Sequence, residues 1–160
     1  MKNKLLKFIF LLLQVLFLAF SCEDDPVTTN NNNGTPSNNI EAEVHRLINL
    51  HRTGIGLPAL VWNDIIAEQC RNHSIDMANA QTINHDGFNE RINIIGETIP
   101  WSWAGENVAY NYSAQSVVTA WLNSPGHKNN IESNSNLTSV GVAFDEDSVM
   151  YFTQIFIRSN

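Results

Sequence analysis

The chain has 160 residues, enough for one domain with additional segments, and its formal net charge at pH 7 is −7. Removal of residues 1–21, which hold three lysines and no acidic residue, would leave a charge of −10 and only six Lys and Arg side chains. Such a chain has no basic patch for nucleic acid and no polybasic segment for an anionic membrane surface, so we expect no nucleic-acid partner.

Residues 1–21 have the pattern of an export signal. Met1–Lys7 is basic, Phe8–Phe20 is apolar except for Gln14, and Cys22 follows one residue later. The apolar run is too short to cross a bilayer but suits the central region of a signal peptide. The sequence LAFSC resembles the lipobox of bacterial lipoproteins, in which cleavage precedes a cysteine that is then lipidated. We therefore expect a lipid anchor on Cys22 at the bacterial outer membrane or cell surface, with ordinary secretion as the alternative.

Residues 22–39 are rich in Asn and have no apolar side chain after Val27. Such a segment cannot bury enough surface to offset its chain entropy, and we expect a disordered tether. The folded domain is then 40–160. If Cys22 is lipidated, Cys70 is left without a disulfide partner and is expected to be a small core residue.

Two helices are predicted in the first half of the domain. The first begins near Ile40 and ends at Gly54 or Gly56, and the second is capped by Asn63 and covers Asp64–Ala80. Each carries a histidine on its apolar face. These are His51 and His73. A single imidazole on such a face is more often a hydrogen-bonded group than a metal ligand.

Residues 81–107 contain no clear periodic pattern and are predicted to be a long irregular connection with at most a helical turn at Glu90 and Arg91. This segment carries His85 and Glu106. Its two tryptophans, Trp101 and Trp103, are expected either to pack under the loop or to line a ligand groove.

A third helix is predicted over Ala114–Asn123 with Ser113 as its cap. The next residues favour a further helix in which Ser124 is the cap, Pro125 the first residue and His127 the third. The positive end of a helix dipole disfavours imidazolium, so His127 is expected to be neutral near pH 7.

The C-terminal third is predicted to be β-structure. Val140, Val142 and Phe144 alternate, a polar turn follows, and residues 149–157 are apolar on both faces. A strand that is apolar on both faces must be covered on both sides, and the helices are the available cover. The expected fold class is therefore α+β, with an antiparallel sheet between helical layers.

His85, Glu106 and His127 are the residues suited to chemistry. Two neutral imidazoles and a carboxylate suit zinc or another divalent cation, with the carboxylate either as a ligand or as a group that orients an imidazole or a water. Spacing alone does not show that the three converge.

Several segments, taken in order, resemble the CAP superfamily of cysteine-rich secretory, antigen 5 and pathogenesis-related 1 proteins, in its bacterial SCP-like form. The resemblance covers about residues 41–156 and includes LINLHRTGIGLPALVWND, HSIDMA, AGENVAY, AWLNSPGHKNNI, LTSVGVAF and YFTQIF. It implies a three-layer α–β–α sandwich with a cleft of two histidines and two acidic residues, sometimes occupied by a divalent ion. The implied members here are His85, Glu106 and His127, whereas the second acid would fall near Ser124, where this chain has none.

Three functions follow as hypotheses. The first is a non-catalytic extracellular binding module whose cleft holds a metal ion and takes a lipid, glycan or peptide, as the resemblance implies. The second is a metal-assisted hydrolase in which His85 and His127 hold the ion and Glu106, the candidate catalytic residue, accepts a proton from bound water. The third is a structural cluster in which the same residues pin the loop without any ligand.

Overall fold

The structure is a computed structural model, and it describes residues 38–160. The predicted signal peptide, the lipidation site at Cys22 and nearly all of the predicted tether lie outside the described residues. Within residues 38–160, none of the helices combines the length and the hydropathy that a bilayer crossing requires.

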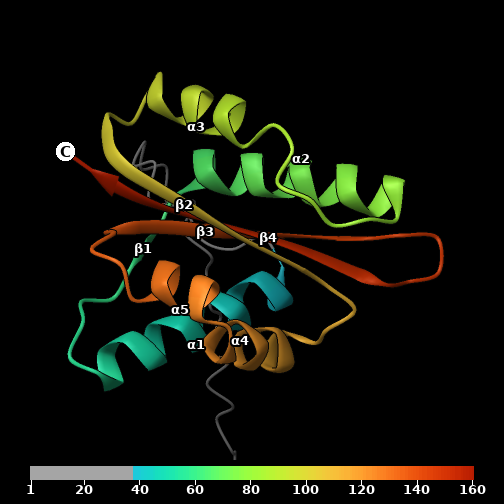
Figure 1. Cartoon of the computed structure of the whole chain (residues 1–160), viewed down its shortest axis with the longest axis horizontal. Coiled ribbons are helices and arrows are strands. Elements are labelled where there is room, and N and C mark those ends of the chain that lie inside the picture. Colours follow the sequence, from blue (N-terminus) through green and yellow to red (C-terminus); the bar gives the residue numbers. More distant parts are fainter. Residues whose placement is uncertain (1–37) are drawn as a thin grey trace, which may run out of the picture. The chain divides into compact units, whose positions relative to one another are not determined.

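A four-stranded sheet forms the middle of the domain (Figure 1). Its strands, in spatial order, are β1 (Val61–Trp62), β3 (Leu137–Phe144), β4 (Met150–Ser159) and β2 (Trp101–Tyr110). The β1 strand pairs with β3 in parallel, and the other two pairings are antiparallel. The strand predicted to be apolar on both faces is β4, which is buried almost throughout and lies between two partners. The mainly antiparallel sheet is thus confirmed.

Helices cover both faces of this sheet (Figure 1). On one face lie α1 (Asn39–Gly54), α4 (Ala114–Asn123) and α5 (Pro125–Ile131), and on the other lie α2 (Asp64–Ala80) and α3 (Phe88–Gly96). One large hydrophobic cluster joins the sheet to α1 and α4, and two smaller clusters join it to the α2 side. The predicted three-layer α–β–α sandwich is confirmed.

The helix starts follow the predicted capping residues. The Asn63 side chain accepts hydrogen bonds from the backbone N–H groups of Ile65 and Ile66 at 3.0 and 3.2 Å, and α2 begins at the next residue. Ser113 and Ser116 form a reciprocal capping box at the start of α4. Each cap satisfies helix N–H groups that have no partner within the helix, which fixes where the helix begins.

The prediction of an irregular connection over residues 81–107 is wrong. The segment contains the helix α3 and the first part of the strand β2. Ile92, Ile95 and Ile99 recur at helical spacing, a periodic signal within this segment. All three are buried, and Ile95 and Ile99 pack with Ile66 and Cys70 of α2 in one core cluster. The strand was missed because Gly105, Glu106 and Asn107, at its centre, have low β propensity and are held there by pairing with β4.

Cys70 is a buried free thiol on the inner face of α2, as predicted. Its Sγ donates a hydrogen bond to the Ser139 carbonyl oxygen at 3.3 Å. Burial raises the pKa of the Cys70 thiol, so the thiolate that a nucleophile or metal ligand requires is disfavoured.

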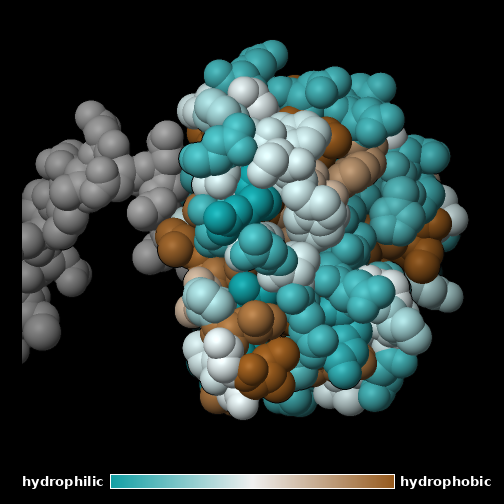
Figure 2. Space-filling model, turned by 60° about the vertical axis from the view of Figure 1, so that its left-hand side comes forward, coloured by the Kyte–Doolittle hydropathy of each residue, from teal (hydrophilic) through white to brown (hydrophobic). Residues whose placement is uncertain are grey.

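The face of the domain drawn in Figure 2 is largely hydrophilic. On the face drawn in Figure 2, hydrophobic residues form only small, separate patches. The more exposed of the large hydrophobic side chains include Leu50, at 60 %, and Phe144, at 55 %. On this face, recesses are therefore better candidates for binding sites than a broad apolar patch.

Candidate functional site

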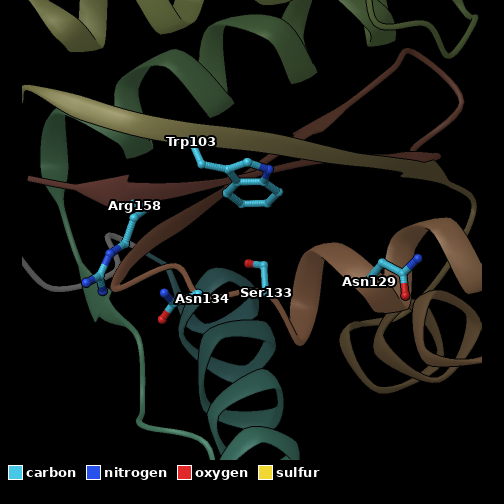
Figure 3. Close-up of a pocket in the computed structure, with 5 residues that line it drawn as sticks. All are labelled: Trp103, Asn129, Ser133, Asn134 and Arg158. Atoms are coloured by element: carbon cyan, nitrogen blue, oxygen red, sulfur yellow. The ribbon is translucent and has the colours of Figure 1, made fainter.

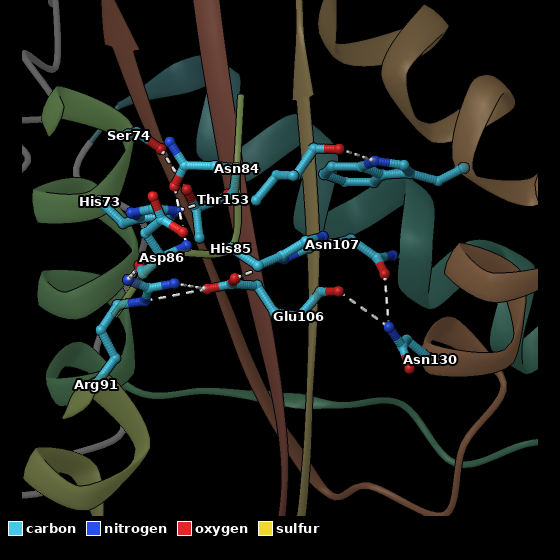
Figure 4. A network of polar contacts seen from close by, with 12 residues as sticks. His73, Ser74, Asn84, His85, Asp86, Arg91, Glu106, Asn107, Asn130 and Thr153 are labelled. Atoms are coloured by element: carbon cyan, nitrogen blue, oxygen red, sulfur yellow. Dashed lines mark hydrogen bonds and ion pairs between the residues drawn. The ribbon is translucent and has the colours of Figure 1, made fainter. Parts of the chain in front are cut away.

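Glu106 is the centre of a buried polar cluster between β2 and the helices α2 and α3 (Figure 4). Its side chain is 2 % exposed. Its Oε1 lies 2.8 Å from His85 Nδ1, and its Oε2 accepts from the Arg91 guanidinium at 3.1 Å (Nε) and 2.6 Å (Nη2). Both carboxylate oxygens therefore already bind N–H donors of the protein itself.

The contact with Glu106 determines how His85 presents its ring. An ionised carboxylate can only accept a hydrogen bond, so His85 Nδ1 carries the proton and donates. The His85 side chain is 55 % exposed, and within residues 38–160 its Nε2 has no hydrogen-bond partner. In the neutral ring, Nε2 then has a free lone pair facing away from the carboxylate. This is the arrangement in which a carboxylate orients a metal-binding histidine.

Arg91 completes the cluster from α3. Its side chain is 9 % exposed, and besides the bidentate contact with Glu106 it donates from Nη1 to the Asp86 carbonyl oxygen at 2.6 Å. The guanidinium balances the buried carboxylate and also fixes the backbone next to His85. The sequence predicts Arg91 only as part of a helical turn; the signal for its role in the site is that it is a single arginine within the apolar spacing of α3.

His127 is the third residue of α5, as predicted, and Pro125 is the first. Burial lowers the pKa of His127 below its ordinary value, and the charge of a protonated His85 lowers it further. The neutral state therefore agrees with the prediction, with burial as the larger cause and the charge of His85 as the smaller. Among the described hydrogen bonds, none joins the His127 ring to Glu106 or to His85, and the charge of His85 acts on His127 only through space.

A second set of contacts ties α5 to β2 (Figure 4). Asn130 Nδ2 donates to the Glu106 carbonyl oxygen at 3.0 Å and to Asn107 Oδ1 at 2.8 Å. Asn107 Nδ2 in turn donates to the His127 carbonyl oxygen at 3.2 Å. These amides, which the sequence analysis did not single out, fix the helix carrying His127 against the strand carrying Glu106.

A pocket of about 270 Å³ lies next to His127. Aromatic and aliphatic side chains form most of its wall, with Ser124 and His127 as polar members. The lining residues are Ile83, Val108, Ala109, Tyr110, Tyr112, Ala120, Trp121, Ser124 and His127. Position 124, where the resemblance implies a second acidic residue, is a serine. Among the described residues, no group of three or more His, Cys, Asp or Glu side chains could hold a metal ion. A metal ion at this place would have at most the imidazoles of His85 and His127 as protein ligands.

The other histidines on apolar helix faces are hydrogen-bonded, as predicted. His51 Nε2 lies 2.7 Å from Glu132 Oε1, and His73 Nε2 lies 2.9 Å from the Asn84 carbonyl oxygen. The two tryptophans divide between the predicted alternatives. Trp101 is partly buried and donates to the Ile92 carbonyl oxygen at 3.0 Å, whereas Trp103 is 37 % exposed and lines a separate recess.

Comparison with known proteins identifies the family. The model of the cysteine-rich secretory protein family, CAP, matches residues 45–156. The chain is 34% identical over 124 residues to the uncharacterised membrane protein YlbC of Bacillus subtilis strain 168, covering 74% of this chain and 34% of YlbC. It is 32% identical over 135 residues to the uncharacterised protein YkwD of the same strain, covering 81% of this chain and 52% of YkwD. The chain thus spans about a third and about half of these relatives.

Solved structures show the same fold. An extracellular protein of Bacillus anthracis that contains an SCP domain superimposes with a TM-score of 0.62 at 30% identity, over 72% of this chain and 39% of that one. An outer surface protein of Borrelia burgdorferi superimposes with a TM-score of 0.66 at 22% identity, over 73% of this chain and 90% of that one. At that lower identity the likeness concerns the fold.

Proposed function

The chain belongs to the cysteine-rich secretory protein family, CAP, and from that premise we propose that it is an exported, non-catalytic binding module. In this proposal a lipidated Cys22 anchors the domain at the bacterial surface, and the cleft at His85 and His127 holds a divalent cation beside the pocket next to His127. Relatives named as extracellular and outer surface proteins support the location outside the cytoplasm. The ligand is a lipid, glycan or peptide whose apolar part enters the pocket.

The observation that carries the proposal is that both oxygens of the buried Glu106 carboxylate accept hydrogen bonds from the protein itself. Oε1 accepts from His85 and Oε2 accepts twice from Arg91, all within 3.1 Å. A general base must reach the water from which it takes a proton, and the Glu106 side chain is only 2 % exposed. Glu106 instead acts on the imidazole, which favours a role in orienting His85 over the role in proton transfer that the hydrolase hypothesis requires.

The residues present fit a borderline cation such as zinc. His85 offers Nε2, since its Nδ1 is used by Glu106, and His127 offers a neutral imidazole because its pKa is lowered. Zinc supplies Lewis acidity to whatever oxygen or nitrogen occupies its remaining positions. With only two protein ligands, those positions are left to water or to a group of the ligand.

The pocket next to His127 supports ligand binding independently of the ion. Tyr110, Tyr112 and Trp121 give it aromatic walls, which suit an aliphatic chain or a ring. His127 lies in its wall, so a ligand in the pocket would lie beside the cation.

The test is a calorimetric zinc titration of the full chain in detergent micelles at pH 7.5. We expect saturable binding that is lost in His85→Ala and in His127→Ala, because each substitution removes one of two protein ligands. Glu106→Gln is expected to weaken binding by about 10–100-fold, the usual effect of removing a group that orients a metal-bound histidine. His51→Ala, which removes an imidazole already paired with Glu132, is the matched control.

Two outcomes would overturn the proposed cation site: no saturable binding in the wild type, or binding that survives in both histidine variants. Absence of zinc binding together with a large loss of stability in Glu106→Gln would favour the structural-cluster hypothesis instead. Hydrolysis of an ester or peptide panel that disappears in Glu106→Gln would favour the hydrolase.

A further inference from the structure

A second recess lies where β2 and β4 reach the end of α5 (Figure 3). It shares no lining residue with the pocket next to His127. Its volume is about 460 Å³, and its lining is formed by Trp103, Asn129, Ser133, Asn134 and Arg158. Trp103 is the single large apolar member, and the other side chains are polar. We refer to it as the Trp103 recess.

The indole of Trp103 forms a platform in this recess. A Cβ atom placed on Gly105 would lie 2.7 Å from Cη2 of Trp103, so the ring rests against strand backbone that has no side chain in the way. The side chain is 37 % exposed, and its Nε1 has no hydrogen-bond acceptor among residues 38–160. A partly exposed indole that packs on the Gly105 backbone and has a free N–H group is suited to stacking on a ligand ring.

Arg158 is the cross-strand neighbour of Trp103 in the register of β2 and β4. Residues 38–160 contain six Lys and Arg against thirteen Asp and Glu, yet Arg158 alone among these six cations has no carboxylate or carbonyl acceptor. The other five are Arg46, Arg52, Arg71, Arg91 and Lys128. An unpaired guanidinium in so acidic a domain is a ready partner for an anionic group from outside.

The polar side chains of the recess are also free to bind a ligand. Within the described part of the chain, neither the Asn129 amide nor the Asn134 amide takes part in a hydrogen bond. Each presents both donors and an acceptor. Ser133 shares its hydroxyl with Ser135 at 2.9 Å.

The wall of the recess is held in place. Asn136 exchanges two hydrogen bonds with Ser159 at the end of β4, both 2.8 Å long. Arg52, buried in α1, donates to the carbonyl oxygens of Ile131 at 2.6 Å and Ser133 at 2.9 Å. The segment that carries Asn134 is therefore preorganised, which lowers the entropy lost when a ligand binds.

A neighbouring recess of about 320 Å³ shares Ser133, Asn134 and Arg158 with the Trp103 recess. Arg158 thus stands between two adjoining compartments, each large enough for a small-molecule unit. The neighbouring recess also has apolar lining residues, Leu57, Pro58 and Ala59, and the carboxylate of Glu132, which is paired with His51 and Lys128. Two adjoining compartments that each combine polar groups with apolar surface suit a chain of linked units that have polar edges and apolar faces, as sugar rings do.

We infer that this paired groove binds an acidic glycan. The apolar face of one sugar ring would stack on Trp103, its carboxylate would bind the Arg158 guanidinium, and the amides of Asn129 and Asn134 would bind its hydroxyl groups. The next sugar unit would occupy the adjoining recess. The inference does not depend on the cation site, because neither His85 nor His127 lines the groove.

The test is calorimetric titration of the full chain in detergent micelles with three acidic glycans: trigalacturonate, a hyaluronan tetrasaccharide and sialyllactose. We expect at least one to bind saturably. Neutralising its carboxylates as methyl esters, or Arg158→Gln, should each weaken binding at least tenfold, and Arg158→Gln should make acid and ester bind equally. Trp103→Ala should also weaken binding at least tenfold, with partial recovery in Trp103→Phe.

Arg46→Gln is the matched control: it removes an exposed guanidinium that pairs with Glu43 and lines neither recess, so glycan binding should be unchanged. Arg158→Gln should leave zinc binding unchanged, which separates this inference from the proposed cation site. Three outcomes would overturn the inference: none of the three glycans binds, acid and ester bind equally to the wild type, or Arg158→Gln leaves the preference for the acid intact. Tighter binding of a tetrapeptide with a free C-terminal carboxylate than of any glycan would also overturn it and assign the groove to peptide ends.

Discussion

Glu106→Gln is expected to lower the free energy of unfolding by about 3–5 kcal/mol, which is the usual cost of removing one partner of a buried ion pair. The substitution keeps the shape of the side chain but removes the charge opposite Arg91, whose side chain is 9 % exposed. The Arg91 guanidinium would then remain buried without a counter-charge. A neutral amide would also replace the carboxylate that accepts hydrogen bonds from His85 Nδ1 and from two nitrogens of Arg91. Urea denaturation followed by circular dichroism measures the change.

Glu97→Gln is the matched control for this experiment. Glu97 is exposed at the end of α3, so the same chemical change should alter stability by less than about 0.5 kcal/mol. The double variant Glu106→Gln with Arg91→Met should lose less stability than the sum of the single variants, because removing both charges leaves neither one unpaired. A loss below about 1 kcal/mol in Glu106→Gln would show that the cluster is not a tightly coupled ion pair.

Gly141→Ala is expected to destabilise the domain by about 3 kcal/mol or more, at or above the upper end for overpacking. A Cβ atom at residue 141 would lie 2.2 Å from the Arg71 backbone nitrogen and 2.3 Å from the Cys70 backbone carbonyl carbon. Those atoms belong to α2 itself, so no side-chain rotation relieves the overlap and the helix must move away from β3. Thermal unfolding of the purified variant, or its failure to accumulate as folded protein, measures the effect.

Gly54→Ala provides the comparison. No atom lies within 4 Å of the position that a Cβ would take at this residue, and its φ is not positive. The variant should be as stable as the wild type or more stable by up to about 1 kcal/mol, because alanine restricts the unfolded chain. If Gly141→Ala were equally harmless, the close approach of α2 to the sheet would not be needed for the fold.

Local chemistry allowed much of the fold to be predicted from the sequence. Asn63 and Ser113 cap their helices through side-chain oxygens, and Pro125 begins α5, so these boundaries depend on neighbouring residues. The strand β4 was evident because its apolar residues fill both faces. His127 was placed correctly on its helix for the same local reason.

The contacts of the site could not be predicted in that way. The strand β2 is held by pairing with β4, whose residues lie about fifty positions later in the sequence, and its centre carries the weak β formers Gly105, Glu106 and Asn107. Arg91 reaches Glu106 only because α3 packs above the same face of the sheet. A partner chosen by tertiary packing has no local signal, so the engagement of both carboxylate oxygens was not foreseen.

The central claim is that Glu106 orients His85 and leaves its Nε2 free for a cation. Determining the tautomer of the His85 ring tests this claim most directly. Long-range nitrogen–proton NMR at pH 8, before and after addition of zinc, determines the tautomer of each histidine ring separately. The expected result is a proton on Nδ1 and an unprotonated Nε2 whose resonance shifts on zinc binding. A proton on Nε2, or a zinc-dependent shift at Nδ1 instead, would contradict the claim.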